Sequence, residues 1–352
     1  MIVMKLATPA SLGFHMPAEW EEHEATLLAW PHDPLTFPDR IGKAEEAYVS
    51  IIKAIALSEK VYLLVLDERM QQRVSAMLLD AGVDLSVVRF FAVPYADVWF
   101  RDYGPTFVVD RNARKRAMVD WIFSAWGDKY EELKKDSAIP SFLNGFFRVK
   151  RFEPGIVMEG GSIDVNGRGM LLTTEQCLLN RNRNPSLSRK QIEEHLKAYL
   201  GVSCIVWLKE GIAGDDTDGH VDDVARFVSP HAVLCAYADS RNDPDFPALG
   251  ENFSILSEAK DNDGSPLAVL KLPVPARKVV DDEGKPLPAS YANFYIGNTV
   301  VLVPQFNDTN DEKAIAVLSG LFPHRKVVGI DCSSLVFGLG TLHCVSQQVP
   351  KV

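Results

Sequence analysis

The stretch Ile163-Asp-Val-Asn-Gly-Arg-Gly-Met-Leu-Leu-Thr173 carries the clearest folding signal in the chain. Its Asn166-Gly167 pair lies between strand-like residues, and this dipeptide favours the two-residue turn of a β-hairpin because both of its residues tolerate positive φ. A capping box, Ser188-Arg-Lys-Gln191, then opens an amphipathic helix. The apolar run 202–208 follows and predicts a buried strand. Residues 163–208 therefore predict one strand–strand–helix–strand unit.

Similar groups of elements recur along the rest of the chain. Apolar residues at helical spacing predict helices over 43–58 and 68–81, and a second capping box, Thr309-Asn-Asp-Glu312, opens another. Two polar stretches rich in Pro, Gly, Asn and Asp, 240–263 and 280–290, are expected to be loops, one of them a candidate lid. Together the elements predict an α/β fold with more strands than helices. Further strands are predicted at 61–66, 85–91, 106–110, 224–237, 295–304 and 326–330.

Composition excludes several classes of protein. The 352 residues are 47% apolar and 24% charged, which is typical of a globular chain and not of a disordered, collagenous or coiled-coil one. Acidic residues outnumber basic ones, 47 to 37, and no dense Lys/Arg run makes a basic face, so we expect no nucleic-acid partner. No apolar run approaches the roughly 18 residues of a membrane span, and residues 1–20 lack a signal-type apolar region. We therefore expect a cytoplasmic protein with a small or cationic partner; the sequence leaves a homo-oligomer open.

The cysteines suggest one reactive thiol. There are five, an odd number, widely spaced, and no CxxC or CxxH pair indicates zinc, so neither a disulfide framework nor a metal site is predicted. Cys344 differs from the other four, which are expected to be small buried hydrophobes. It follows His343 directly in the glycine-rich polar segment 338–348, where a thiolate could be exposed and activated.

Three other segments concentrate polar residues. In Ala96-Asp-Val-Trp-Phe-Arg-Asp-Tyr-Gly-Pro105, Asp97 either joins a site or caps the turn before Trp99, and Arg101 with Asp102 could also form a purely structural pair. In Met158-Glu-Gly-Gly-Ser162, the acid before two glycines is also compatible with a simple turn.

The third segment, Thr217-Asp-Gly-His-Val-Asp-Asp223, carries the strongest chemical signal of the three. His220 and Asp222 are two residues apart, so on a strand they project from the same face, and a carboxylate beside an imidazole suits a general acid/base. A metal site or a solvated loop would also fit these residues.

In their residues and in their order along the chain, these segments resemble those of the agmatine deiminases of the guanidine-modifying (pentein) superfamily. The resemblance extends from about Gly13 to the C-terminus, and although each motif alone is weak, the ordered set is specific. It is carried by residues 13–20, 29–31, 99–105, 159–162, 173–185, 214–222 and 342–348.

The resemblance implies a five-bladed α/β propeller of ββαβ units around a central pocket, with residues 1–352 forming one catalytic domain. It assigns Cys344 as the nucleophile and His220 as the general acid/base. Asp102 and Asp222 would clamp the guanidinium, and Glu159 would orient His220 and hold a substrate nitrogen. No metal or organic cofactor is implied.

At the far end of the pocket, Trp99 would form an apolar wall for an aliphatic chain, and Asp216 would lie near the tail amine of the substrate. Asp216 stands where this family usually has Glu. The segment before Cys344 also lacks the usual three consecutive glycines and Asn-Ile-His, and residues 32–38 lack the family's Arg- and Asn-containing run. These departures concern the pocket rim.

The implied activity is hydrolysis of agmatine to N-carbamoylputrescine and ammonia through a covalent thiouronium on Cys344, a C–N hydrolase reaction of linear amidines that serves putrescine biosynthesis. A deiminase of arginine or peptidyl-arginine is the first alternative. It would need a cation for the α-carboxylate, and Arg181, Arg183 and Arg241 are candidates. A pentein that only binds a partner is the second alternative, although it would have no use for five catalytic residue types.

Overall fold

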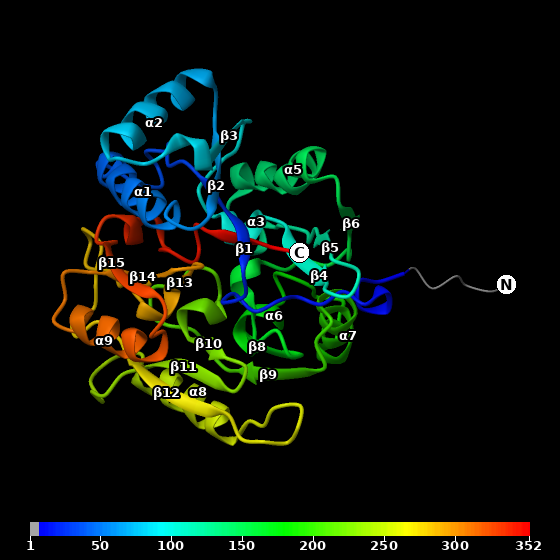
Figure 1. Ribbon diagram of the computed structural model, residues 1–352. Helices are drawn as coiled ribbons and strands as arrows, with labels where there is room; N and C mark the ends of the chain where they lie inside the picture. Colours follow the sequence, from blue (N-terminus) through cyan, green and yellow to red (C-terminus); the bar gives the residue numbers. More distant parts are fainter. Residues whose placement is uncertain (1–6) are drawn as a thin grey trace.

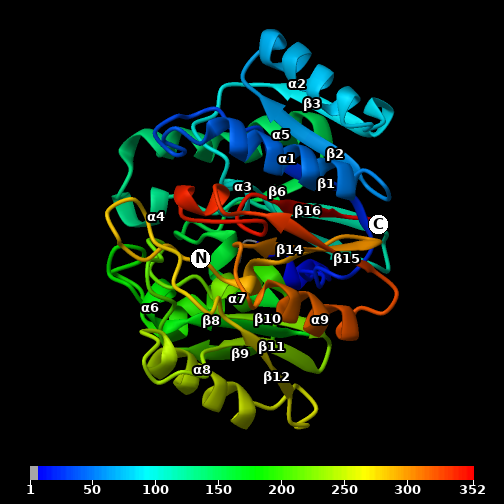
Figure 2. The same ribbon diagram turned by 90° about the vertical axis from the view of Figure 1, so that its left-hand side faces the viewer.

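The computed structural model describes residues 7–352, and its strands form five small sheets that make a five-bladed propeller (Figure 1). Residues 1–6, the start of the N-terminal stretch discussed above, lie outside the described residues. Helices α2 (Glu68–Asp80) and α8 (Phe246–Glu258) lie at opposite ends of the molecule in both views (Figures 1 and 2). Among residues 7–352, none of the helices combines the length and apolar character of a bilayer-spanning segment.

Four of the five blades repeat one topology. Two strands pair antiparallel as a hairpin, and a helical connection then leads to a third strand that pairs parallel with the second, because a parallel pair needs a crossover. Three of the blades are β4 (Thr106–Asp110), β5 (Lys115–Val119) and β6 (Lys150–Phe152); β7 (Asp164–Val165), β8 (Met170–Thr174) and β9 (Cys204–Leu208); and β10 (Ala225–Ser229), β11 (Ala232–Tyr237) and β12 (Ala268–Pro273). The fourth is β13 (Tyr295–Ile296), β14 (Val300–Gln305) and β15 (Lys326–Asp331).

The remaining blade joins the two ends of the chain. Strand β16 (Gln347–Pro350) pairs antiparallel with β1 (His23–Ala29), and β1 continues in parallel to β2 (Lys60–Val65) and β3 (Val88–Ala92). The last strand of the sequence therefore supplies the first strand of this blade. The helices are α1 (Ile41–Ile55), α2 (Glu68–Asp80), α3 (Phe100–Tyr103), α4 (Ala125–Asp128), α5 (Ile139–Phe147), α6 (Glu175–Leu178), α7 (Arg189–Leu200), α8 (Phe246–Glu258) and α9 (Asp311–Leu321).

The unit that opened the sequence argument is confirmed. Strands β7 and β8 pair across the predicted turn, where Gly167 has a φ of 66°. Ser188 and Gln191 form both bonds of the capping box, and Gly201 ends helix α7 in the left-handed region.

Three local predictions are wrong. His220 and Asp222 do not lie on a strand, because residues 221–223 form a 3-10 turn. The stretch 240–263 is not a loop or lid, because its core is helix α8, whose Leu249 and Leu256 are buried and which packs against β11. The Thr309 capping box does not form either: the N-cap of α9 is Asn310, without a side-chain cap bond. Asp311 instead accepts hydrogen bonds from Tyr291 and from the backbone of Phe306, which draws its carboxylate into the core.

Candidate active site

The candidate residues occupy equivalent places in the five blades. A short helical or 3-10 turn precedes the first strand of four blades, at 100–103, 160–162, 221–223 and 291–293, and the segment 335–346 takes this place before β16. Successive turns contact one another around the centre of the ring. The fold therefore brings Asp102, Glu159, His220, Asp222 and Cys344 together from four blades, although up to 242 residues separate them in the chain.

Asp102 is held by two donors. The backbone N–H of Gly161 donates to its Oδ1 at 3.0 Å and the Trp126 indole donates to its Oδ2 at 2.9 Å. Trp126 reaches this place from α4, where residues 125–128 all have positive φ, an uncommon backbone state that is tolerated where surrounding structure imposes it. Burial, followed by the charge of Asp222, raises the pKa of Asp102 well above its usual range.

His220 and Glu159 lie at the buried base of the site. Glu159 Oε1 pairs with Arg183 Nε at 2.9 Å, whereas Glu159 Oε2 and both ring nitrogens of His220 have no hydrogen-bond partner in the described part of the chain. His220 Nδ1 lies 3.7 Å from Asp102 Oδ1. Burial lowers the pKa of His220 to about 3, so its imidazole is neutral in the empty site.

Cys344 faces a group that could stabilise its thiolate. The side-chain amide of Asn293 donates to Cys344 Sγ at 3.0 Å, and Asp222 Oδ2 lies 3.9 Å from the sulfur. Burial, reinforced by Asp222 and Asp223, raises the pKa of the Cys344 thiol well above its usual range. The sulfur is therefore a neutral thiol while the site holds no cation.

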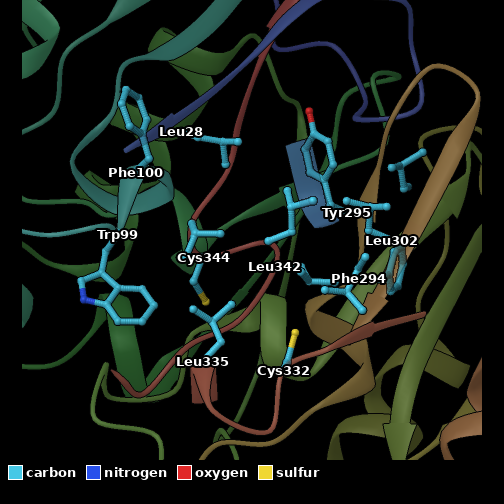
Figure 3. Packing of buried hydrophobic residues seen from close by; sticks show 14 of the residues in the cluster. Leu28, Trp99, Phe100, Phe294, Tyr295, Leu302, Cys332, Leu335, Leu342 and Cys344 are labelled. Atoms are coloured by element: carbon cyan, nitrogen blue, oxygen red, sulfur yellow. The ribbon is translucent and has the colours of Figure 1, made fainter. Parts of the chain in front are cut away.

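A cavity of about 220 Å³ leads from the surface to Cys344. Trp99, Trp126, Asp102 and Cys344 line its inner part. The mouth is lined by half-exposed or exposed residues that include Asp33, Leu35, Glu132 and Asp216. Figure 3 shows Cys344 among the apolar side chains Trp99, Leu335 and Leu342.

Asp97 and Asp216 also line this cavity. Asp97 accepts hydrogen bonds from the Trp99 indole at 3.0 Å and from Thr36 at 2.7 Å, so it orients the apolar wall; burial raises its pKa to about 6. Asp216 accepts from the Tyr130 hydroxyl at 2.5 Å and lies 3.4 Å from Lys129 Nζ.

The arginines considered for an α-carboxylate do not face the cavity. Arg183 is buried between Glu159 and Asp218, and Arg181 and Arg241 are exposed side chains outside the cavity lining. Among the described residues, no Lys or Arg lines the cavity, whereas five carboxylates do: Asp33, Asp97, Asp102, Glu132 and Asp216.

Two groups of side chains could offer three ligand atoms to a metal. The ligand atoms within each group lie within 4.8 Å of one another. Both groups share residues with the site described above, since one is Glu159, Cys177 and His220 and the other is Asp222, Asp223 and Cys344.

The sequence did not point to Asn293, Trp126 or Glu19. Asn293 lies in the turn before β13, the place that holds a candidate residue in the other blades, so element order is the one signal that could have found it. Trp126 lies in an irregular left-handed turn without a motif, and Glu19 reaches the site only through His343.

Comparisons with known proteins agree with this geometry. The family model of the Porphyromonas-type peptidyl-arginine deiminases matches residues 15–350. An agmatine deiminase of Medicago truncatula is 41% identical over 376 residues, which cover 98% of each chain. The solved structure of an agmatine deiminase of Enterococcus faecalis has a TM-score of 0.91 at 34% identity, again over 98% of each chain. A structure of a C. jejuni agmatine deiminase with substrate bound has a TM-score of 0.85 at 31% identity, over 96% of each chain.

Proposed function

Because the chain belongs to the family of the Porphyromonas-type peptidyl-arginine deiminases, we propose that it hydrolyses agmatine to N-carbamoylputrescine and ammonia. Full-length similarity to named agmatine deiminases of a plant and of bacteria supports this substrate. The proposal includes one catalytic domain over residues 1–352, a cytoplasmic location and a role in putrescine formation.

The cavity lining is the observation that carries the proposal. Agmatine is a cation at both ends, with a guanidinium and an ammonium joined by an aliphatic chain. The lining offers carboxylates at both depths, Asp102 inside and Asp33, Glu132 and Asp216 at the mouth, with the apolar face of Trp99 between them. Carboxylates grip the N–H edges of a guanidinium in paired, charge-assisted hydrogen bonds.

The same lining disfavours the arginine alternatives. An arginine or peptidyl-arginine substrate would bring a carboxylate or peptide carbonyl to the mouth, where acidic side chains gather and no cationic side chain of the described residues lines the cavity. A binding-only pentein would not need a thiol, an imidazole and carboxylates converging on one buried point.

Substrate binding starts the chemistry. The guanidinium settles between Asp102 and Asp222, whose Oδ1 has no hydrogen-bond partner among the described residues. Its positive charge reverses the local potential that raises the pKa of Cys344, so the thiol proton passes to neutral His220. The Asn293 amide, 3.0 Å from Sγ, stabilises the thiolate that forms.

The thiolate then attacks the guanidinium carbon and forms a C–S bond. His220 returns its proton to the departing nitrogen, the C–N bond breaks, and ammonia leaves an S-alkylthiouronium on Cys344. Water enters, gives a proton to His220 and adds to the same carbon. The C–S bond breaks as the adduct's hydroxyl becomes the ureido carbonyl, His220 returns its proton to the sulfur, and the hydroxyl proton converts the released ammonia to ammonium; the ureido product and the free cysteine are then released. The sum is one guanidinium and one water converted to one ureido group and one ammonium.

Glu159 has a supporting part in these steps. Its Oε1 is fixed by Arg183, and its Oε2, which has no hydrogen-bond partner among residues 7–352, is available to the substrate nitrogen or to His220. Burial raises the pKa of Glu159, while the charge of Arg183 opposes this shift.

Ammonia release tests the proposal. Purified protein is offered agmatine, free arginine and a blocked peptidyl-arginine in parallel, with Cys344→Ser as the control variant. We expect turnover of agmatine alone, abolished in Cys344→Ser. Turnover of the arginine compounds and not of agmatine would keep the mechanism but show that the substrate is an arginine compound. If none of the three compounds releases ammonia, the proposed activity is overturned.

A second measurement tests the mouth of the cavity. Asp216→Asn should raise the KM for agmatine and leave unchanged the KM for butylguanidine, which lacks the tail ammonium. Equal effects on both compounds would show that Asp216 does not meet the ammonium.

A further inference from the structure

A chain of buried charges lies directly behind Asp222, away from the cavity. His343 Nδ1 bonds to Asp222 Oδ2 at 2.7 Å, and His343 Nε2 bonds to Glu19 Oε2 at 2.9 Å. Glu19 Oε1 pairs with Arg226 at 2.9 Å, and Arg226 pairs with Asp164 at 2.9 Å on its other side. The side chains in these pairs are no more than 8% exposed.

The geometry constrains the protonation of His343. A carboxylate oxygen only accepts, and a neutral imidazole carries one N–H, so two carboxylates on the two ring nitrogens require an imidazolium or a protonated acid. Although burial opposes it, the charges of Arg226, His343 and Arg101 hold the pKa of Glu19 well below its usual range. The hydrogen bond and charge of His343 likewise lower the pKa of Asp222 against the effect of burial. Each ring nitrogen of His343 is thus held by one carboxylate, Asp222 on the side of the cavity and Glu19 behind it.

The neighbouring acids show what Asp222 would do without this contact. Asp223, the next residue, has no basic partner in the described chain and its pKa is raised well above its usual range by burial and by Asp222. Asp102 shifts in the same direction. Asp222 differs from Asp102 and Asp223 in its bond to His343, and its pKa is shifted in the opposite direction.

We propose that His343 and Glu19 are positioning residues that keep Asp222 ionised and aim its free Oδ1 at the guanidinium before the substrate arrives. The inference deepens the proposed function and rests on it. His343 binds Oδ2 of Asp222, whereas Oδ1 of Asp222 has no hydrogen-bond partner among residues 7–352, and Glu19 holds the other ring nitrogen of His343.

Ionised Asp222 has a direct consequence for binding. A guanidinium only donates hydrogen bonds, so a protonated Asp222 would present a neutral group and a competing O–H. Without His343, binding would have to expel that proton, and apparent affinity would fall about tenfold for each pH unit below the pKa of Asp222. The groups that face His343 also include Arg101, whose Nε donates to the His343 carbonyl at 3.3 Å, together with Cys344 and, through space, His220.

The test compares His343→Asn with the wild-type protein from pH 6 to pH 9. Asn keeps a donor for Asp222 but removes the positive charge. We expect the KM for agmatine to rise about tenfold or more at pH 6 and to return toward the wild-type value at pH 9, while kcat changes less than about threefold. Glu19→Gln, which keeps an acceptor for His343, should shift the curve in the same direction.

Glu59→Gln is the matched control. Glu59 is another buried carboxylate paired with a histidine, His23, at 3.2 Å, and it lines no part of the cavity. We expect this variant to lose stability and to keep the wild-type dependence of KM on pH. If His343→Asn and Glu19→Gln behave in the same way as Glu59→Gln, the two residues are only structural and the inference is overturned.

A measurement without substrate separates this inference from the proposed function. Because a carboxylate lies on each ring nitrogen of His343, ¹⁵N NMR of the wild-type protein without substrate should show both nitrogens as hydrogen-bond donors. A ring with only one donor nitrogen would overturn the inference whatever guanidine the enzyme accepts. If another guanidine replaces agmatine as substrate, the proposed function fails, and the shift of KM with pH is measured on that guanidine.

Discussion

At the scale of the residue, the site depends on Gly161, whose lack of a Cβ leaves space for the catalytic side chains. A Cβ on Gly161 would lie 2.6 Å from His220 Nδ1, 2.9 Å from Asp102 Oδ1 and 3.0 Å from Asp222 Oδ2. Three groups of the proposed mechanism thus converge on the space beside this glycine. Gly160 is crowded too, since a Cβ there would meet the Arg101 carbonyl oxygen at 2.2 Å.

Gly161→Ala should therefore lower kcat/KM by about 100-fold or more, because a displacement of the order of 1 Å in reacting groups costs this much. Steady-state kinetics and a circular dichroism spectrum check the result. Gly145→Ala is the control: its Cβ would meet nothing within 4 Å in helix α5, so activity should stay and stability should rise by about 0.5–1 kcal/mol. Wild-type activity in Gly161→Ala would show that the space beside Gly161 is not needed to hold the catalytic side chains in place.

Some site residues could be predicted from their side-chain chemistry, whereas others could not, because their contacts join distant parts of the chain. Cys344, His220 and Asp222 stand in short polar segments whose residue types suggest catalysis, and the structure brings them together. Asn293 is 51 residues from Cys344, and Glu19 is 324 residues from His343. Such contacts form only when the blades close into a ring, and a local sequence pattern cannot predict them.

At the scale of the element, similar patterns had different outcomes. The capping-box sequence occurs at both Ser188 and Thr309, but only Ser188 is an N-cap in the structure, with an extended backbone (ψ of 159°) that directs its side chain at the helix start. Asn310 precedes α9 in a helical conformation, with ψ of −4°. Local sequence fixed the helix position in both cases, whereas tertiary contacts of Asp311 decided the cap.

Ser188→Ala should lower the free energy of unfolding by about 1 kcal/mol, since it removes the side-chain bond to the first turn of α7. Thr309→Ala should leave it within about 0.5 kcal/mol, as for other exposed positions. Urea unfolding of both variants, with activity measured in parallel, checks the pair. An equal loss in both would mean that Thr309 caps α9 in solution.

At the scale of the whole molecule, the ring needs both ends of the chain. Strand β16 follows the Cys344 segment and pairs with β1, so the nucleophile is held in place only when the first and last parts of the sequence meet. The sequence predicted hairpins and helices inside blades, where contacts are local. It did not predict β1 or β16, because their pairing joins residues more than 300 positions apart.

Closing the ring also buries acids whose pKa values shift in opposite directions, and this makes the stability of the protein depend on pH. Burial raises the pKa of Asp97 to about 6 and that of Asp136 to about 7. The folded state therefore binds more protons than the unfolded chain between about pH 4 and pH 7, and the stability from these groups is lost as the pH rises through 6–7. Glu19 and Asp222 have lowered pKa values, so their contribution is lost as the pH falls below the usual range of acids.

The free energy of unfolding should thus pass through a maximum near pH 5, between these two transitions, and decline toward pH 7.5. Urea unfolding at half-unit steps of pH measures the curve. Asp136→Asn removes one of the raised groups, which accepts the backbone N–H of Asp97 at 3.0 Å. This variant should be less stable at pH 5 and show a smaller decline from pH 5 to pH 7.5. A stability that rises over this interval in the wild-type protein, with an unchanged slope in Asp136→Asn, would show that Asp136 takes up no proton on folding and would contradict the prediction.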